Sequence, residues 1–169
     1  MIDCSREKFH IPSDQMDSPW KTDSVIAHSV CLRRSLKRWT GRELLPGVAD
    51  PLELSHKVFE ASFVLVSHGM EADPILNYGN RTALALWEMS WEELTRTPSR
   101  LTAEAPARDE RARLLAAVAA RGFIDDYSGV RISKTGRRFR IARATVWNLL
   151  TDAGDPCGQA AMFSEWKFL

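Results

Sequence analysis

The residues of this sequence that could hold a small molecule are arginine, tyrosine and glutamine side chains in its second half. Arg100, which follows Pro98 and Ser99, could clamp a carboxylate through two parallel hydrogen bonds. It could equally pair with an acidic side chain of the chain itself, such as Asp125 or Asp126. Arg100 is therefore a candidate anion-binding residue with a structural alternative.

A second set of candidates lies on alternating segments nearer the C-terminus. Tyr127 and Arg131 share parity with Phe123. If that parity faces a pocket, a phenol and a guanidinium enter the pocket; otherwise they form a surface pair. Gln159 offers short-range hydrogen bonds on the last segment.

The usual catalytic constellations are missing from the sequence. Asp125 and Asp126 are adjacent, and neighbours on a strand point to opposite faces, so they cannot form a close acid–base pair. His68 and Glu104 have no evident partner, and no nucleophile–base–orienter set is visible. The histidines show no HExxH or HxH spacing and the cysteines no CxxC pair, which argues against a bound metal. The sequence therefore favours a binding protein over an enzyme.

Composition bounds the class of protein. The chain has 169 residues, the size of one domain, and 44% of them are hydrophobic. Its 23 Lys and Arg against 22 Asp and Glu argue against a partner such as nucleic acid or an anionic membrane. The first 20 residues contain no signal peptide, no stretch is long and apolar enough for a membrane helix, and the three cysteines lie far apart. We expect a cytoplasmic protein.

The N-terminal third predicts an arm and two helices. Residues 1–20 mix charges and prolines without periodicity, which is typical of a mobile arm. A helix is predicted from Asp23, with an apolar stripe formed by Val25, Leu32, Leu36 and Trp39. Asp50 and Pro51 are a good cap and first residue for a second helix. The two helices span about residues 23–60.

The remainder predicts a sheet with helices between its strands. Extended segments are expected over residues 63–67, 74–78, 123–133, 137–150 and 157–168. Helices are expected over residues 80–89, over 90–97 and over 109–121. Strict alternation would place Phe139 and Ile141 on the same face as Trp147. Because both parities of the last two segments are partly apolar, the middle helices should cover one face and the N-terminal helices the other.

This order of elements is similar to that of the PAS fold, an α+β fold. The resemblance implies a five-stranded antiparallel sheet with strand order 2-1-5-4-3, covered by a helical flap and here also by two N-terminal helices. We expect a single domain over residues 21–169, with the PAS-like core over about residues 62–169.

Several ordered motifs resemble the MEKHLA domain family, which is itself similar to PAS domains. They are DPILNYGN at 73–80, GFIDDY at 122–127, GRRFRI at 136–141 and GQAAMF at 158–163. That domain ends the plant class III homeodomain–leucine zipper proteins and also occurs as a free-standing bacterial protein, the form that this sequence resembles. Since the sequence has no homeodomain and no sustained heptads, DNA binding is not carried over. The resemblance implies a sensory or interaction module.

PAS-like folds hold ligands between the sheet and the flap, so the resemblance also gives candidate ligand-binding residues. They are Asn80, Trp87, Trp91, Arg100, Tyr127, Arg131, Arg140, Trp147, Gln159 and Phe163. Some have structural alternatives: Asn80 could be a helix cap, and Trp87 and Trp147 could be core residues instead of platforms for a planar ligand.

The cofactors of PAS relatives are a poor match to this sequence. Light-sensing relatives read a flavin with a Gln in the final strand and react with it through a Cys in the flap. The flap, residues 80–121, has neither Cys nor His. We therefore expect neither flavin–thiol photochemistry nor a haem of the usual PAS kind, and the cofactor is left unassigned.

Three functions are compatible with these observations. The favoured one is a PAS-like sensory module that binds a small organic ligand, or a protein partner, through sheet and flap. The second is a ligand-free homodimer that pairs through the N-terminal helices. The third is a small α+β enzyme, which would need a buried Asp, Glu or His with a shifted pKa inside a cavity.

Overall fold

The computed structural model describes residues 18–169, except for the side chains of residues 105–107. Most of the predicted arm, residues 1–17, lies outside the described residues. The last residues of that segment belong to the folded part, because Pro19–Lys21 form a short 3-10 helix, η2. The ring of Trp20 stacks on that of His56, with 4.1 Å between their centroids.

The two N-terminal helices form where the sequence predicts them. Helix α1 (Asp23–Thr40) is capped by the Thr22 side chain and ends at Gly41. Helix α2 (Pro51–Phe59) is capped by Asp50, whose carboxylate accepts the backbone N–H of Glu53 at 2.8 Å.

The sheet has the predicted strand order. Its strands are β1 (Val64–His68), β2 (Leu76–Gly79), β3 (Phe123–Ile132), β4 (Arg138–Leu150) and β5 (Pro156–Phe163). They pair antiparallel in the order β2-β1-β5-β4-β3. The expected last strand is interrupted at Ser164, and a short sixth strand, β6 (Glu165–Phe168), continues beside β4.

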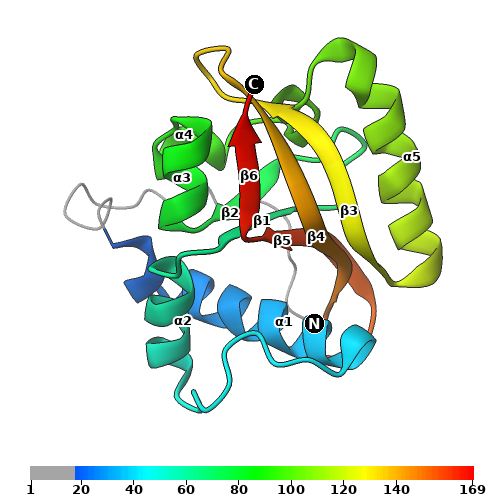
Figure 1. Ribbon diagram of the computed structural model, residues 1–169. Coiled ribbons are helices and arrows are strands. Elements are labelled where there is room, and N and C mark those ends of the chain that lie inside the picture. Colours follow the sequence, from blue (N-terminus) through cyan, green and yellow to red (C-terminus); the bar gives the residue numbers. More distant parts are fainter. Residues whose placement is uncertain (1–17) are drawn as a thin grey trace.

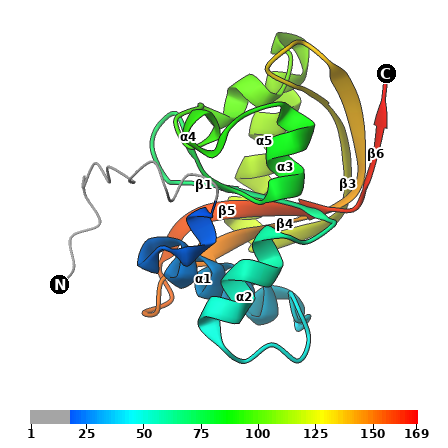
Figure 2. The ribbon, with the colours of Figure 1, turned by 90° about the vertical axis from the view of Figure 1, so that its left-hand side faces the viewer.

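The flap lies between β2 and β3 in the sequence. It contains α3 (Arg81–Trp87), α4 (Trp91–Leu94), the 3-10 helix η3 (Ser99–Thr102) and α5 (Ala105–Arg121). Ser90 and Glu93 form a complete capping box at the start of α4. The molecule therefore has three layers, with α3, α4 and α5 on one face of the sheet and α1 and α2 on the other (Figures 1 and 2).

Each face of the sheet has its own hydrophobic core. The core beneath the N-terminal helices joins Leu32, Leu36 and Leu54 to Trp147 and Leu149 of β4. The stripe that we expected to serve a homodimer is thus largely used inside the chain. A homodimer through these helices stays a prediction, and it would have to use their outer face.

The second core lies beneath the flap. It joins Leu86 and Trp87 of α3 to Phe139, Ile141 and Phe163 of the sheet. The Trp87 ring meets those of Phe139 and Phe163 edge to face, at centroid distances of 5.4 and 6.2 Å.

A bulge in β3 decides which of its side chains face the flap. Ile124 pairs with Val146, but Tyr127 pairs with Ala144, so β3 has one more residue than β4 across this stretch. Asp126 takes up the extra residue with a φ of +60°. Phe123 therefore packs on the side of the N-terminal helices, while Tyr127 contacts the flap core. The sequence interpretation that gave Phe123 and Tyr127 one face was wrong for this reason.

A matching bulge lies in β4 two pairs further on. Gly129 pairs with Ile141, and Arg143, with a φ of +51°, is the extra residue. It places Phe139 and Ile141 under the flap and Trp147 under the N-terminal helices. Strict alternation along β4 is therefore wrong as well.

The junction between flap and sheet rests on helix α1. Helix α5 ends at Gly122, with a φ of +96°, and a Cβ there would lie 2.4 Å from the ring of Trp39. The Trp39 indole N–H donates to the backbone carbonyl of Asn148 at 3.0 Å. The backbone N–H of Asn148 donates in turn to the carbonyl of Gly122 at 2.8 Å.

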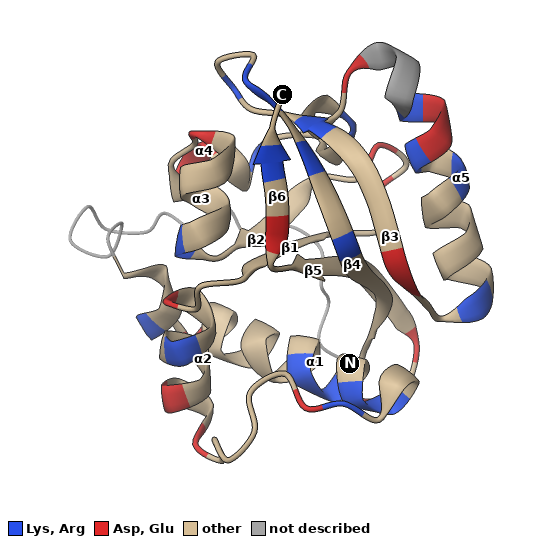
Figure 3. Ribbon diagram, viewed as in Figure 1, with Lys and Arg blue, Asp and Glu red and all other residues tan. Residues whose placement is uncertain are grey.

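Lys and Arg residues gather on the outer side of α1 (Figure 3). Several of them have acidic partners: Arg34 pairs with Asp152, and Lys37 pairs with Glu43. These residues are well exposed, and such pairs contribute little to stability. The acidic partners offset the basic charge of the helix, in agreement with the overall charge of +1.

Candidate functional site

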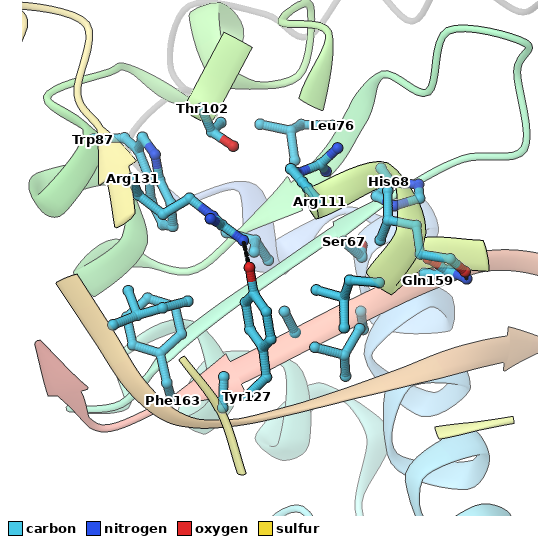
Figure 4. A pocket seen from close by; sticks show the side chains of 18 residues that line it. Ser67, His68, Leu76, Trp87, Thr102, Arg111, Tyr127, Arg131, Gln159 and Phe163 are labelled. Carbon is cyan, nitrogen blue, oxygen red and sulfur yellow. Dashed lines mark hydrogen bonds between the residues drawn. The ribbon is translucent and has the colours of Figure 1, made fainter. Parts of the chain in front are cut away.

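A cavity lies between the sheet and the flap (Figure 4). Its volume is about 60 Å³, enough for several water molecules or one small organic molecule. Its walls come from β1, β2 and β3–β5, and from α3, η3 and α5 of the flap. Most of the walls are apolar, and the polar groups lie at a few places, as is usual for a small-molecule site.

Tyr127 and Arg131 occupy one side of the cavity. The Asp126 bulge turns both side chains toward the flap. Arg131 is 7% exposed; its guanidinium donates to the Tyr127 hydroxyl at 3.1 Å and to the carbonyl of Val130 at 2.8 Å. No carboxylate pairs with it among the residues that the structure describes. The cavity thus holds a buried, uncompensated positive charge.

A second guanidinium reaches the cavity from helix α5. Arg111 is half-buried and makes no hydrogen bond or ion pair with any described residue. Burial lowers the pKa of Arg111 to about 10, and the nearby charge of Arg131 acts in the same direction. Figure 4 places Arg111 between Arg131 on one side and His68 on the other.

Gln159 is held in one orientation on the opposite side. Its Nε2 donates to the carbonyl of Leu115 in α5 at 3.0 Å and to the Asn148 Oδ1 at 3.1 Å. Asn148 Nδ2 itself donates to the carbonyl of Val118 at 3.0 Å. Both donors of Gln159 are used, and its Oε1 is a buried acceptor without a partner among the described residues.

His68 lies directly across from Gln159 in the pairing of β1 with β5. Its Nδ1 contacts the carbonyl of Gly69 at 2.8 Å, and since a carbonyl can only accept, Nδ1 carries the proton. Burial lowers the pKa of His68, so the neutral ring is favoured. The Nε2 of His68 is therefore a second buried acceptor without a partner.

Five of the ten predicted ligand-binding residues line this cavity. They are Trp87, Tyr127, Arg131, Gln159 and Phe163. Their role in binding stays a prediction. Trp87 belongs to the flap core, and its indole N–H is buried without a hydrogen-bond partner among the described residues.

The other five do not line the cavity. Asn80 is a buried cap: its Oδ1 accepts the backbone N–H groups of Leu65 and Ala83, each at 3.1 Å. Its Nδ2 donates to the carbonyls of Val58 and Phe63. All the capacity of this side chain is used within the chain.

Trp91 packs edge-on against Tyr78, with the ring centroids 5.7 Å apart, on the side of the N-terminal helices. Trp147 is fully buried in the same core. Arg140 is exposed on β4. Arg100 forms an exposed ion pair at 3.0 Å with Asp73, which is neither of the acids that we considered.

The sequence interpretation missed Arg111, and named His68 only as a base without a partner. Arg111, Leu114, Leu115 and Val118 follow the i, i+3, i+4, i+7 spacing of one helix face, and this spacing could have found Arg111. His68 follows the apolar residues Val64 and Val66 in strict alternation on β1, which indicates the same face.

Acidic and sulfhydryl groups are missing from the cavity walls that the structure describes. Within residues 18–169 no group of three His, Cys, Asp or Glu side chains could hold a metal ion. In the same range no helix is long and apolar enough to cross a membrane.

Three solved structures show the same fold at low sequence identity. A PAS domain from Colwellia psychrerythraea is 15% identical with a TM-score of 0.58, and the match covers 71% of this chain and 98% of that one. A fungal light-oxygen-voltage photoreceptor domain is 17% identical with a TM-score of 0.56, and the match covers 92% of this chain and 98% of that one. An RNA-binding light-oxygen-voltage receptor is 19% identical with a TM-score of 0.61; 73% of this chain matches 36% of that one.

A search of curated proteins found no match. The model of the MEKHLA domain family matches residues 26–168, nearly the whole described chain, and its span runs from α1 to β6. It therefore includes both N-terminal helices together with the PAS-like sheet and flap. This chain belongs to the MEKHLA domain family.

Proposed function

We propose that this chain is a cytoplasmic sensory module that binds one small organic ligand in the cavity between sheet and flap. One observation carries the proposal: three buried polar atoms at the cavity have no partner among the described residues. They are Trp87 Nε1, His68 Nε2 and Gln159 Oε1. Unsatisfied buried polar atoms are costly, so native proteins usually satisfy them with a ligand or with ordered water.

The size of the cavity limits the ligand. Its volume of about 60 Å³ is below the roughly 300–1,000 Å³ of sites for drug-sized molecules. A flavin does not fit these residues. The cavity is too small for its three rings, and the flap contains no Cys. The ligand is a compact molecule of few atoms.

The layered structure provides a route from ligand to response. Gln159 at the cavity contacts Asn148, and the backbone of Asn148 contacts Trp39 of α1. A ligand that moves Gln159 therefore acts on a side chain coupled to both α5 and α1. Such coupling supports a sensory role for the binding site.

Native mass spectrometry of the protein purified from its own host tests the proposal. We expect one added mass of a small organic compound, lost on denaturation. The variant Ala161→Leu, which places a larger side chain in the cavity wall, should lack the added mass. Ala85→Leu, on the exposed surface of α3, should retain it. Host-purified protein without any added mass, or an added mass that Ala161→Leu retains, would overturn the proposal.

A further inference from the structure

We propose that the ligand is a small organic carboxylate that also carries a hydroxyl or N–H group. This inference rests on the proposed function and adds the chemical class of the ligand. Arg111 and Arg131 would bind the carboxylate, and His68 and Gln159 would accept the hydrogen bond from the hydroxyl or N–H.

The balance of charge around the cavity favours an anion. Two guanidiniums face the cavity, and none of the described residues that line it has a carboxylate. Asp73, the acid that acts on Arg111, is already paired with Arg100. Buried charges in proteins are normally paired, because an unpaired charge in an apolar site is costly. A bound anion would supply the missing negative charge.

Hydrogen-bond geometry favours a carboxylate as that anion. A guanidinium has five N–H donors in a planar fork that matches the two oxygens of a carboxylate. Arg131 uses Nη1 for Val130 and Nη2 for Tyr127, which leaves other donors free. All donors of Arg111 lack a partner among the described residues.

The opposite side of the cavity requires a donor on the ligand. His68 Nε2 and Gln159 Oε1 are both acceptors, and they lie on paired residues of β1 and β5. Figure 4 shows these two side chains together, across the cavity from Arg131 and Tyr127. A simple carboxylate without a hydroxyl or N–H would leave both acceptors unsatisfied. Short hydroxy acids have both groups and are compact enough for this volume.

Matched probes separate these requirements. Protein freed of ligand by unfolding and refolding is titrated with 4-hydroxybutyrate, butyrate and 4-hydroxybutyramide, and NMR measures the binding. Glycolate and 3-hydroxypropionate test the distance between the carboxylate and the hydroxyl of the ligand. We expect the hydroxy acid to bind about ten times or more tightly than the amide, which lacks the charge, and than butyrate, which lacks the donor. Chloride, sulfate and phosphate test for a site that accepts any anion.

Arginine variants test the assignment. Arg111→Gln and Arg131→Gln should each weaken binding of the hydroxy acid about tenfold or more and leave binding of the amide nearly unchanged. Arg140→Gln, at an exposed arginine of the same sheet, should change neither. A thermal melt of each variant shows that it is folded.

Several results would overturn the inference. They are equal affinity for acid and amide, inorganic anions that bind as tightly as the organic acids, or full binding by both arginine variants. A neutral compound found in the host-purified protein would overturn it and leave the proposed function intact. If the host-purified protein carries nothing and no probe binds, both proposals fail.

Discussion

Gln159 and Asn148, on neighbouring strands of the sheet, are joined by a hydrogen bond of 3.1 Å from the Gln159 Nε2 to the Asn148 Oδ1. Gln159 faces the cavity, and Asn148 also holds α5 through the carbonyl of Val118. One buried amide pair thus connects the cavity, the sheet and the flap. Gln159 also contacts α5 directly, through the carbonyl of Leu115 at 3.0 Å.

The Asn148→Ala substitution should destabilise the protein by about 2 kcal/mol, because it removes the side-chain donor to the Val118 carbonyl and one of the two acceptors of Gln159 Nε2. Urea unfolding measures the change. Asn77→Ala is the control, since Asn77 is exposed and its amide only accepts a hydrogen bond from Ser67. Equal losses in the two variants would contradict the role given to Asn148.

The Asn80→Ala substitution should cost about 3 kcal/mol, more than an ordinary helix cap, because four backbone groups, most of them buried, each lose a hydrogen bond. Ser90→Ala removes an exposed cap and should cost about 1 kcal/mol. Both variants, tested by urea unfolding and then by titration with 4-hydroxybutyrate, should bind like the unmodified protein. A selective loss of binding in Asn80→Ala would show that Asn80 does contact the ligand.

The Arg111→Met substitution should raise the stability of the ligand-free protein by about 1 kcal/mol. It removes a half-buried charge without a partner and keeps a long apolar side chain against the cavity. The same variant should lose binding of 4-hydroxybutyrate. Thermal unfolding with and without the acid measures both effects. A lower melting temperature without the acid would mean that Arg111 has a stabilising partner.

The Cys31 thiol should react as a thiolate at neutral pH. A hydrogen bond from Cys157 is the largest of the effects that lower the pKa of Cys31 to about 6, while burial acts in the opposite direction. In a Cys4→Ser background, the rate of alkylation by iodoacetamide should therefore have its midpoint near pH 6. Cys157→Ser should move that midpoint upward. A midpoint near pH 9 in the parent protein would refute the assignment.

Stability should fall as the pH is lowered below about 6.5. His28 contacts the Ser67 hydroxyl at 2.8 Å, and burial lowers the pKa of His28 to about 4. The folded protein therefore keeps His28 neutral, while the unfolded chain takes up a proton below its ordinary pKa of 6.5. Between pH 6.5 and 4 the proton uptake of the unfolded chain lowers the free energy of unfolding by up to about 1.4 kcal/mol per pH unit. His68 acts in the same direction, because burial lowers its pKa too.

Urea unfolding at pH 7, 6 and 5 measures this dependence, and His28→Gln isolates the contribution of His28. The difference in stability between the parent and this variant should shrink as the pH falls. A difference that does not depend on pH would show that His28 titrates normally in the folded protein.

The order of elements could be predicted from the sequence because each helix and strand buries one or two faces, and burial imposes a period on the residues. The cap of α2 at Asp50 and the turn at Gly136 are local signals of the same kind. The strand order required the likeness to a known fold. Pairing between distant strands leaves no period in a single sequence.

The face of the sheet to which each side chain of β3 and β4 points could not be predicted in the same way. A bulge of one residue reverses every face that follows it, and nothing in Asp126 or Arg143 alone requires a positive φ. The pairing of the two strands decides it. For this reason the two candidate residues Tyr127 and Arg131 were found together, but their direction into the cavity was not.

The contact between Trp39 and Gly122 constrains how this chain can vary in evolution. A side chain at position 122 would occupy the space of the indole ring, and the backbone at that position also favours glycine. A smaller residue at position 39 would remove the steric conflict at position 122, but the positive φ there would still favour glycine. Glycine should therefore be kept at position 122 wherever a large ring is kept at position 39.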